Sequence, residues 1–502
     1  MTLLGCDSHG WGSHGSHALA LFALAWLATG WASAAEPVAR EEGLAKIRYT
    51  LEGIQIRGNR RTADRVVLRY VPFEVGDVLD VDDPELELTR FRLLGTGFFS
   101  AARLSLRRGS KRGAAVLIVQ VVERNTVIVE HVAMGIAADE DAEGNSEPIS
   151  PYLTLQVAET NLAGTGITLG AGVGVAADQF ALETRFADPA VMGSPWMINA
   201  SLRYINARDY FGNKEVSFES PHLEQREVTD YAVVDYTRFG GTVGVGHEVS
   251  LSTRVFLDYN LERVEATVPT AASHVRGETR EPIDFDILPG SSVLSSLRAS
   301  LSYDTRDAPF LPTQGSLGNV RGTIGAPPLG SSYSYQKLEA SWTSWWKLPW
   351  RHIIGLEARI GAVAGDAPFF EKFYVGDFTD LLPGRFLGLN PDRRQPPNYF
   401  GTDIAEVRYG DYAARLATEY RIPLYSGGGT VYGIDFFAGG GIYGAATQRE
   451  LDDPPSGYEG AERIPIDLTY NLGLRIETFV GGFSVAFSNL LGLLPARGGG
   501  RK

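Results

Sequence analysis

The chain has 502 residues, a formal net charge of −14 and 44% hydrophobic residues. This length allows two domains, or one small domain followed by a large β-architecture. The net negative charge argues against nucleic acid as a partner, because phosphate recognition requires a surplus of Lys and Arg. Cys6 is the one cysteine, so the rest of the chain contains no disulfide and no thiol for catalysis or metal binding.

Residues 1–35 have the pattern of a secretory signal peptide. An apolar stretch from Ala18 to Ala32 leads into Ala32-Ser33-Ala34, a small-residue cleavage pattern. Beyond this segment, no stretch approaches the ~20 apolar residues that a helical membrane span requires. The sequence therefore predicts an exported protein without helical spans.

Residues 46–125 form the first predicted domain, a small α+β unit. Apolar periodicity and turn residues indicate the order strand, helix, helix, strand, strand. The expected ranges are 49–56, 62–71, 84–95, 102–106 and 114–122.

Residues 126–494 change to two-residue alternation that is rich in Gly, Tyr, Phe and Trp. One face of a late segment carries Leu468, Tyr470, Leu472, Leu474 and Ile476, and the other carries Thr469, Asn471, Arg475 and Glu477. A soluble sandwich also alternates, but its strands are usually shorter than ten residues. Long strands, aromatic clusters at strand ends and long polar loops favour a transmembrane barrel.

The predicted fold is mostly β, a transmembrane antiparallel β-barrel of 14–16 strands, with 16 favoured, after one small α+β domain. Single-chain bacterial barrels have even strand numbers, so closure leads us to expect fourteen or sixteen strands. Residues 495–502 are expected to form a flexible tail. The expected strands begin near Thr126, Tyr152, Gly166, Gln179, Trp196, Tyr231, Thr242, Ser252, Val293, Ser316, Tyr333, Arg351, Tyr412, Thr430, Leu468 and Phe483.

The N-terminal unit resembles a POTRA domain. The resemblance rests on Gly58-Asn59 after the first strand, Gly76-Asp77 between the helices, and a leucine-rich stretch that ends in Gly97-Phe98-Phe99. It implies a periplasmic docking domain, whose sheet edge adds a strand from an unfolded client. A plain structural spacer is the alternative. The signature residues are Gly58, Asn59, Gly76, Gly97 and Phe99.

The barrel region resembles the superfamily of BamA, TamA and the two-partner-secretion transporters. Residues 159–166 resemble its early Glu-x-Asn-Leu-x-Gly-x-Gly turn, and residues 186–189 resemble the Asp-Pro hairpin that follows. The strongest match is residues 303–315, which resemble the family's Asp-Thr-Arg-Asp…Pro-Thr-x-Gly hairpin. The motif residues are Asp304, Arg306, Asp307, Pro312 and Gly315.

The same resemblance implies a loop inserted into the lumen, with its apex at Gly384, Arg385 and Phe386. Arg and Phe are adjacent here, whereas the family usually separates them by Gly. A buried arginine requires carboxylate partners, and Glu419 and Asp435 are the expected ones. Ala438 stands where the family usually has Asp. The alternative is that Arg385 is an ordinary solvated loop residue.

The sequence predicts no catalytic residue, no metal site and no cofactor. Gly439–Gly444 fits G-x-G-x-x-G but no helix is expected after it, so dinucleotide binding is disfavoured. The resemblance implies a non-enzymatic outer-membrane protein assembly, insertion or translocation factor. Its barrel is expected in the bacterial outer membrane and its POTRA domain in the periplasm.

The expected partners are outer-membrane lipids, unfolded outer-membrane or secreted clients, and accessory assembly proteins. The room for a single POTRA domain favours a dedicated or accessory role over a general insertase. Two alternatives are a passive or gated pore, and a surface antigen or adhesin that acts through long loops such as 265–290.

Overall fold

A computed structural model describes most of the chain from Arg48 to Ser488. The described ranges are 48–140, 146–212, 216–219, 226–229, 231–276, 279–379, 385–391, 398–453, 455 and 457–488. The predicted signal peptide, the predicted tail and Gly384 lie outside these ranges.

The N-terminal α+β unit has the predicted order of elements, with one added strand. Its sheet has the order β2-β1-β4-β3, in which β1 and β4 are parallel and β3 and β4 are antiparallel. The first helix ends at Leu68 and not near Val71, and the short strand β2 has no counterpart in the prediction. The elements are β1 (Arg48–Arg57), α2 (Asp64–Leu68), β2 (Val78–Asp80), α3 (Pro84–Gly95), β3 (Phe99–Arg108) and β4 (Ala114–Glu123).

The longer helix of this unit starts where the sequence chemistry favours a start. The Asp83 carboxylate accepts a hydrogen bond from the Glu85 backbone N–H at 2.9 Å, and Pro84 occupies the first helical turn. The apolar faces of the helices and strands share one core, which includes the fully buried Val67, Leu93 and Leu117. The unit therefore has a hydrophobic core of its own.

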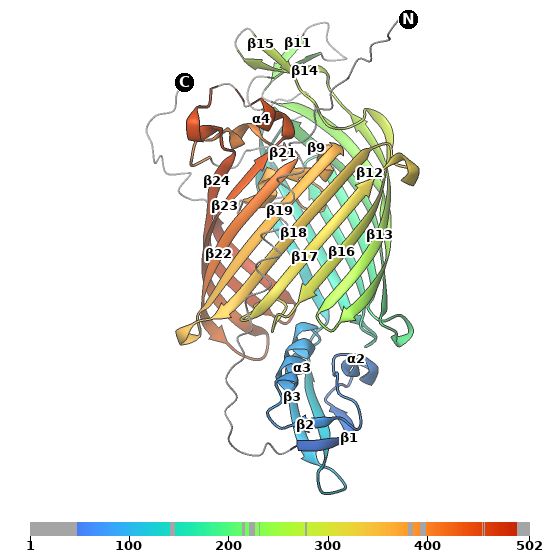
Figure 1. Cartoon of the computed structure of the whole chain (residues 1–502). Helices are drawn as coiled ribbons and strands as arrows, with labels where there is room; N and C mark the ends of the chain where they lie inside the picture. The colour runs from blue at the N-terminus through green and yellow to red at the C-terminus, as the bar shows by residue number, and fades with distance from the viewer. Residues whose placement is uncertain are drawn as a thin grey trace, which may run out of the picture. The chain divides into compact units, whose positions relative to one another are not determined.

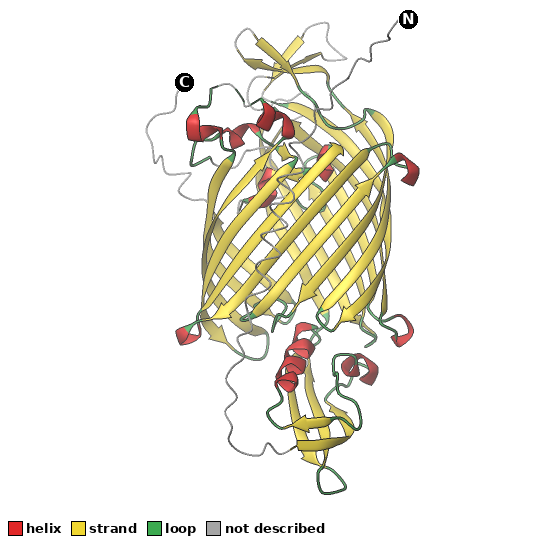
Figure 2. Ribbon diagram, in the orientation of Figure 1, coloured by secondary structure: helices red, strands yellow, loops and turns green. Residues whose placement is uncertain are grey.

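Most of the described residues beyond Asn125 belong to one 15-stranded sheet, which curves into a nearly closed barrel (Figures 1 and 2). Each strand pairs antiparallel with its neighbour. The strands are β5 (Val127–Glu140), β6 (Ser146–Leu162), β7 (Ile167–Ala176), β8 (Gln179–Asp188), β9 (Trp196–Phe211), β12 (Ala232–Ser250), β13 (Thr253–Thr267), β16 (Gly290–Asp304), β17 (Gly315–Gly325), β18 (Ser334–Lys347), β19 (Ile353–Asp366), β22 (Tyr412–Ser426), β23 (Val431–Ala446), β24 (Ile466–Thr478) and β25 (Gly481–Ser488).

Short elements decorate the connections between barrel strands. One small sheet has four strands, β10 (Val216–Glu219), β11 (Arg226–Thr229), β14 (Thr270–Arg276) and β15 (Thr279–Pro282). Another has two strands, β20 (Phe373–Tyr374) and β21 (Tyr409–Gly410). Helix α4 spans Gln448–Asp452, and 3₁₀ turns lie at Val191–Gly193, Pro327–Leu329, Pro349–Arg351, Phe369–Glu371, Val375–Phe378, Asp403–Glu406 and Gly460–Arg463. We call the barrel end that carries α4 the long-loop end and the opposite end the short-turn end (Figure 1).

Side chains along each strand alternate between the outer face and the lumen. On β24, Leu472 and Leu474 are exposed on the outer face, whereas Asp467 and Thr469 are buried on the inner face. Apolar-out and polar-in alternation is the pattern of a barrel surrounded by lipid. No helix in the described ranges has the length and apolar content to cross a membrane.

The fifteen barrel strands of the described residues lie within the predicted range of 14–16 but differ from the favoured number of 16. The segments predicted to begin near Tyr231 and Thr242 are one strand of 19 residues, β12. Gly240 and Gly241 lie in its middle, directly before Thr242. Both glycines pair with residues of β9 and β13. A Cβ at Gly240 would lie 2.1 Å from the Leu261 carbonyl oxygen. Close backbone packing, and not a turn, therefore explains these glycines.

Candidate functional site

The described parts of the loop between β19 and β22, residues 367–379, 385–391 and 398–411, lie in the lumen near the long-loop end, and we call them the lumen loop. Its aromatic side chains pack against inward-facing residues of β9, β12 and β13, such as Tyr236 and Val264. Phe369 is fully buried, with its ring edge-on to Phe211 and Tyr236 at 5.3 and 5.2 Å. The loop is therefore a packed part of the barrel interior.

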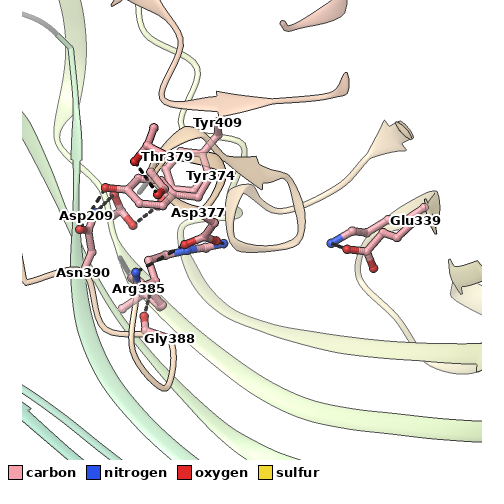
Figure 3. A network of polar contacts seen from close by, with 12 residues as sticks. Asp209, Glu339, Tyr374, Asp377, Thr379, Arg385, Gly388, Asn390 and Tyr409 are labelled. Carbon is pink, nitrogen blue, oxygen red and sulfur yellow. Dashed lines mark hydrogen bonds and ion pairs between the residues drawn. The ribbon is translucent and has the colours of Figure 1, made fainter. Parts of the chain in front are cut away.

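A buried carboxylate of the barrel wall, Asp209 on β9, holds the lumen loop (Figure 3). Asp209 has no exposed surface and accepts hydrogen bonds from the Tyr409 hydroxyl and from the Asn390 amide, the latter at 3.1 Å. The Arg408 guanidinium lies 3.6 Å from the same carboxylate. A buried charge with these partners is compensated, so it fixes three positions of the loop.

Arg385, the predicted apex, lies next to this centre with 17% of its side chain exposed, so it is not an ordinary solvated loop residue. It pairs with Asp377 of the same loop at 2.9 Å and lies over the rings of Tyr374 and Tyr409 at 5.0 and 5.7 Å. Burial lowers the pKa of the Arg385 guanidinium, but Asp377 and Tyr409 raise it more, so its pKa lies above the ordinary value. Arg385 therefore remains charged at any physiological pH.

The predicted carboxylate partners of Arg385 are wrong. Glu419 pairs with Arg475 and lies 3.6 Å from Arg421, and Asp435 lies 3.5 Å from Arg421. Both carboxylates face the lumen as expected, but at another depth. Glu419 is seven positions along β22 from Tyr412, roughly 23 Å at ~3.3 Å per residue. Sequence order indicates which face a residue takes, but not which loop reaches it.

Phe386 contacts the part of the barrel wall that is formed by the first two strands. Its ring lies 5.2 Å from His131 on β5 and 5.8 Å from Tyr152 on β6. The next residues, Leu387 and Leu389, contact β7 where its inward positions are Gly172 and Gly174. A Cβ at these glycines would lie 3.3 and 3.0 Å from the two leucine side chains. Alternate glycines on one strand face thus leave room for the loop, a signal that the sequence analysis missed.

A second buried ion network, also missed at the sequence level, lies beside the first. Glu262 on β13 pairs with Arg238 at 2.7 Å and with Arg203 at 2.9 Å, and Arg238 reaches Glu371 of the lumen loop at 3.8 Å. Arg238 also lies over the Phe370 ring at 3.9 Å. Loop and wall are therefore joined by charges as well as by aromatic packing.

The predicted hairpin motif forms the turn between β16 and β17 at the short-turn end. Arg306 donates two hydrogen bonds to Asp304, at 2.9 and 2.8 Å, and a third to the Pro309 carbonyl at 3.1 Å. The Asp307 carboxylate accepts from the Thr313 backbone N–H at 2.8 Å. The side chains of the motif therefore form hydrogen bonds with backbone groups of the same hairpin.

The tip of this hairpin is attached to the barrel interior. The Pro312 carbonyl accepts a hydrogen bond from Arg421 on β22, whose side chain is almost fully buried. Leu311 lies 3.0 Å from the Cβ position of Gly433 on β23, and Phe310 lies 3.2 Å from that of Gly482 on β25. Because β16 and β17 lie in the middle of the strand order, the hairpin spans the lumen toward its last strands.

Gly315 ends this hairpin in a conformation that other residues rarely adopt. Its φ is +101°, and a Cβ would lie 2.3 Å from the Thr305 carbonyl oxygen. We expect Gly315→Ala to reduce the folded fraction of the barrel, measured by heat-modifiable gel migration. Gly330→Ala is the matched control, because Gly330 has φ +88° and open space around its Cβ position. In the control, the left-handed backbone destabilises the folded state by only about 1–2 kcal/mol. Equal losses of folded barrel in both variants would contradict the prediction.

The POTRA-signature residues occupy turns and core positions of the α+β unit. Gly58 has φ +95°, and a Cβ there would lie 1.9 Å from the Val121 carbonyl oxygen. Asn59 donates to the Thr62 carbonyl at 3.0 Å, and Phe99 is buried. Gly76 and Gly97 also have positive φ, +106° and +75°.

The first and last barrel strands, β5 and β25, leave a seam that one backbone–backbone hydrogen bond crosses among the described residues. The Val129 N–H donates to the Val480 carbonyl at 2.6 Å, and no ladder joins the two strands in the described ranges. Arg124 reinforces this point by pairing with Glu477 at 3.0 Å. Fifteen antiparallel strands also mean that β5 and β25 run in the same direction.

The described ranges contain no cluster of three His, Cys, Asp or Glu side chains arranged to hold a metal ion.

A family model decides what this barrel is, because the Omp85 superfamily domain matches residues 161–487. The chain belongs to the Omp85 superfamily. This result confirms the resemblance to BamA and to the two-partner-secretion transporters. Members related to BamA are outer-membrane β-barrel proteins, in agreement with the lipid-facing alternation described above.

Two curated Omp85 relatives cover different shares of the chain. The outer membrane protein assembly factor BamA of Nitratidesulfovibrio vulgaris is 23% identical over 87% of this chain and 51% of its own length. A putative outer membrane protein assembly factor of Treponema pallidum is 22% identical over 53% of this chain and 32% of its own length. The chain thus spans about half the length of the first relative and a third of the second.

Among solved structures, CdiB from Escherichia coli has the same fold with a TM-score of 0.52. It is 12% identical, and the match covers 88% of this chain and 73% of that chain.

Proposed function

We propose that this Omp85 protein assists the assembly of other proteins into the outer membrane, or their passage across it. The seam between β5 and β25 is the observation that carries the proposal. Strand edges in a bilayer expose N–H and C=O groups that have no water to bind, so an incoming strand that pairs with them is stabilised. An edge that is free in the membrane favours addition of a client strand.

The proposed roles of the parts follow from this seam. The short turns of outer-membrane barrels face the periplasm, so the α+β unit, as a POTRA domain, would receive unfolded clients there. The barrel would then pass the client strand to its free edges. Curated relatives that are named as assembly factors support this direction, and no step of it requires a catalytic residue or cofactor.

The packed lumen makes a wide passive pore the weaker alternative. The lumen loop occupies the interior near the long-loop end through Asp209, Glu262 and the aromatic cluster. A passive pore requires a continuous water-filled channel past these residues. A large, steady conductance of the wild-type protein that is unaffected by changes at Arg385 would favour the pore.

A reversible crosslink across the seam tests the proposal. We expect Val129→Cys with Val480→Cys, bridged by a short bis-methanethiosulfonate reagent, to lose client assembly because the edges can no longer separate. Quantitative mass spectrometry of the outer-membrane proteome measures this loss, and a reducing agent should restore assembly.

The control pair for this experiment is Leu474→Cys with Val485→Cys. These residues face each other on β24 and β25, inside the existing ladder. A crosslink there leaves the seam free, so assembly should be unaffected. Normal assembly with a fully crosslinked seam pair would overturn the proposal.

A further inference from the structure

The outer face of the barrel carries an apolar groove near the long-loop end, across β19, β22, β23 and β24. Its volume is about 510 Å³. Strand pairing aligns Ile360, Ala414, Gly444 and Ile466 in one row across the four strands. The two small residues form the floor of this row, and the two isoleucines form its walls.

The next row toward the short-turn end closes the lower part of the groove. It aligns Ala358, Leu416, Ile442 and Leu468. Leu416 and Ile442 are about half exposed, so their side chains stand above the floor made by Ala414 and Gly444. The depression therefore arises from side-chain size and not from a break in the sheet.

Helix α4 forms the upper boundary of the groove. Leu451 of this helix lines the groove and is 51% exposed. The helix lies above the ends of β23 and β24 in Figure 1. An apolar side chain held in this position over an outward-facing apolar floor extends the hydrophobic surface beyond the strands.

The position of α4 is fixed by polar contacts with the barrel rim. The Tyr412 hydroxyl, on the outer face of β22, donates to the Gln448 side chain at 2.7 Å, and the Gln448 N–H donates to Asp411 at 2.9 Å. A capping box between Thr447 and Glu450 closes the first turn of the helix. Leu451 is therefore held in place over the groove.

We propose that this groove binds one acyl chain of a membrane lipid. The floor and walls face outward on a transmembrane barrel, so the medium that meets them is hydrocarbon. An added strand would leave unpaired backbone N–H and C=O groups in that medium, whereas an acyl chain has none. The polar groups of α4, including Tyr412 and Gln448, would lie at the level of the lipid headgroup.

This site is separate from the seam, since β19 to β24 belong to the uninterrupted part of the sheet. The proposal predicts a resident lipid that is retained longer than the lipids around the rest of the barrel. If no such lipid is found, the proposed assembly function is unaffected.

Filling the groove tests the proposal. Ala414→Phe places a ring on the floor, and native mass spectrometry of the full chain in detergent measures the lipid that co-purifies. We expect one retained lipid in the wild type and at least a tenfold lower occupancy in A414F. Ala438→Phe is the matched control, because Ala438 is exposed on the outer face of β23 but does not line the groove. Heat-modifiable migration verifies that both variants fold.

Crosslinking locates the lipid independently. A phospholipid with a photoreactive diazirine in its acyl chain should label peptides containing residues 412–416 and 442–446 above the other outward surfaces. Uniform labelling around the barrel, or equal lipid retention in A414F and wild type, would show ordinary annular lipid only and would overturn the proposal.

Discussion

Replacing Asp209 with asparagine is expected to release the lumen loop and raise the conductance of the barrel. The substitution keeps the size of the side chain but leaves Arg408 buried opposite a neutral group, and it weakens the acceptor for Tyr409. Removing one partner of a buried charge pair costs about 3–5 kcal/mol. Planar-bilayer recordings of the purified protein measure the result.

The control for this prediction is Asp178→Asn. Asp178 also pairs with an arginine, Arg208, at 3.4 Å, but its side chain is 75% exposed. Arg208 keeps a second carboxylate partner, Asp235, at 3.5 Å, so no buried charge is left uncompensated and this variant should conduct like the wild type. Limited proteolysis should cut residues 367–411 faster in D209N only. Unchanged conductance and unchanged proteolysis of D209N would show that aromatic packing alone holds the loop.

Strand positions were predictable from sequence because lipid and lumen impose opposite chemistry on alternate residues. The start of β9 at Trp196, of β8 at Gln179 and of β22 at Tyr412 agree with the structure to the residue. The prediction of two strands beginning near Tyr231 and Thr242 was wrong, because β12 runs without a turn from Ala232 to Ser250.

The site was less predictable, because its contacts depend on depth in the barrel and on the path of a loop. Asp209 is one acidic residue at an inward strand position, and no local pattern distinguishes it from a water-exposed lumenal carboxylate. Its role depends on Tyr409 and Asn390, about 200 positions away. In contrast, the hairpin of Asp304 to Gly315 closes on itself, so its motif could be recognised from local sequence.

Deleting residues 46–123 is expected to leave a folded barrel that no longer supports client assembly. The α+β unit has its own core, so the barrel sheet loses none of its strands. The deletion removes the sheet that we propose receives the client, so the effect on assembly should be near complete. Quantitative outer-membrane proteomics of a strain that carries only the shortened protein measures this loss.

The end point of this deletion matters, because the next two residues belong to the seam. Arg124 pairs with Glu477 and donates to the Thr478 carbonyl at 3.1 Å, and Asn125 donates to the Phe479 carbonyl at 3.1 Å. A longer deletion, 46–125, removes these contacts as well and should also reduce the heat resistance of the barrel. Comparison of the two deletions therefore separates loss of the docking unit from damage to the seam. Normal client assembly in the 46–123 strain would contradict the docking role, because the barrel alone would then be sufficient.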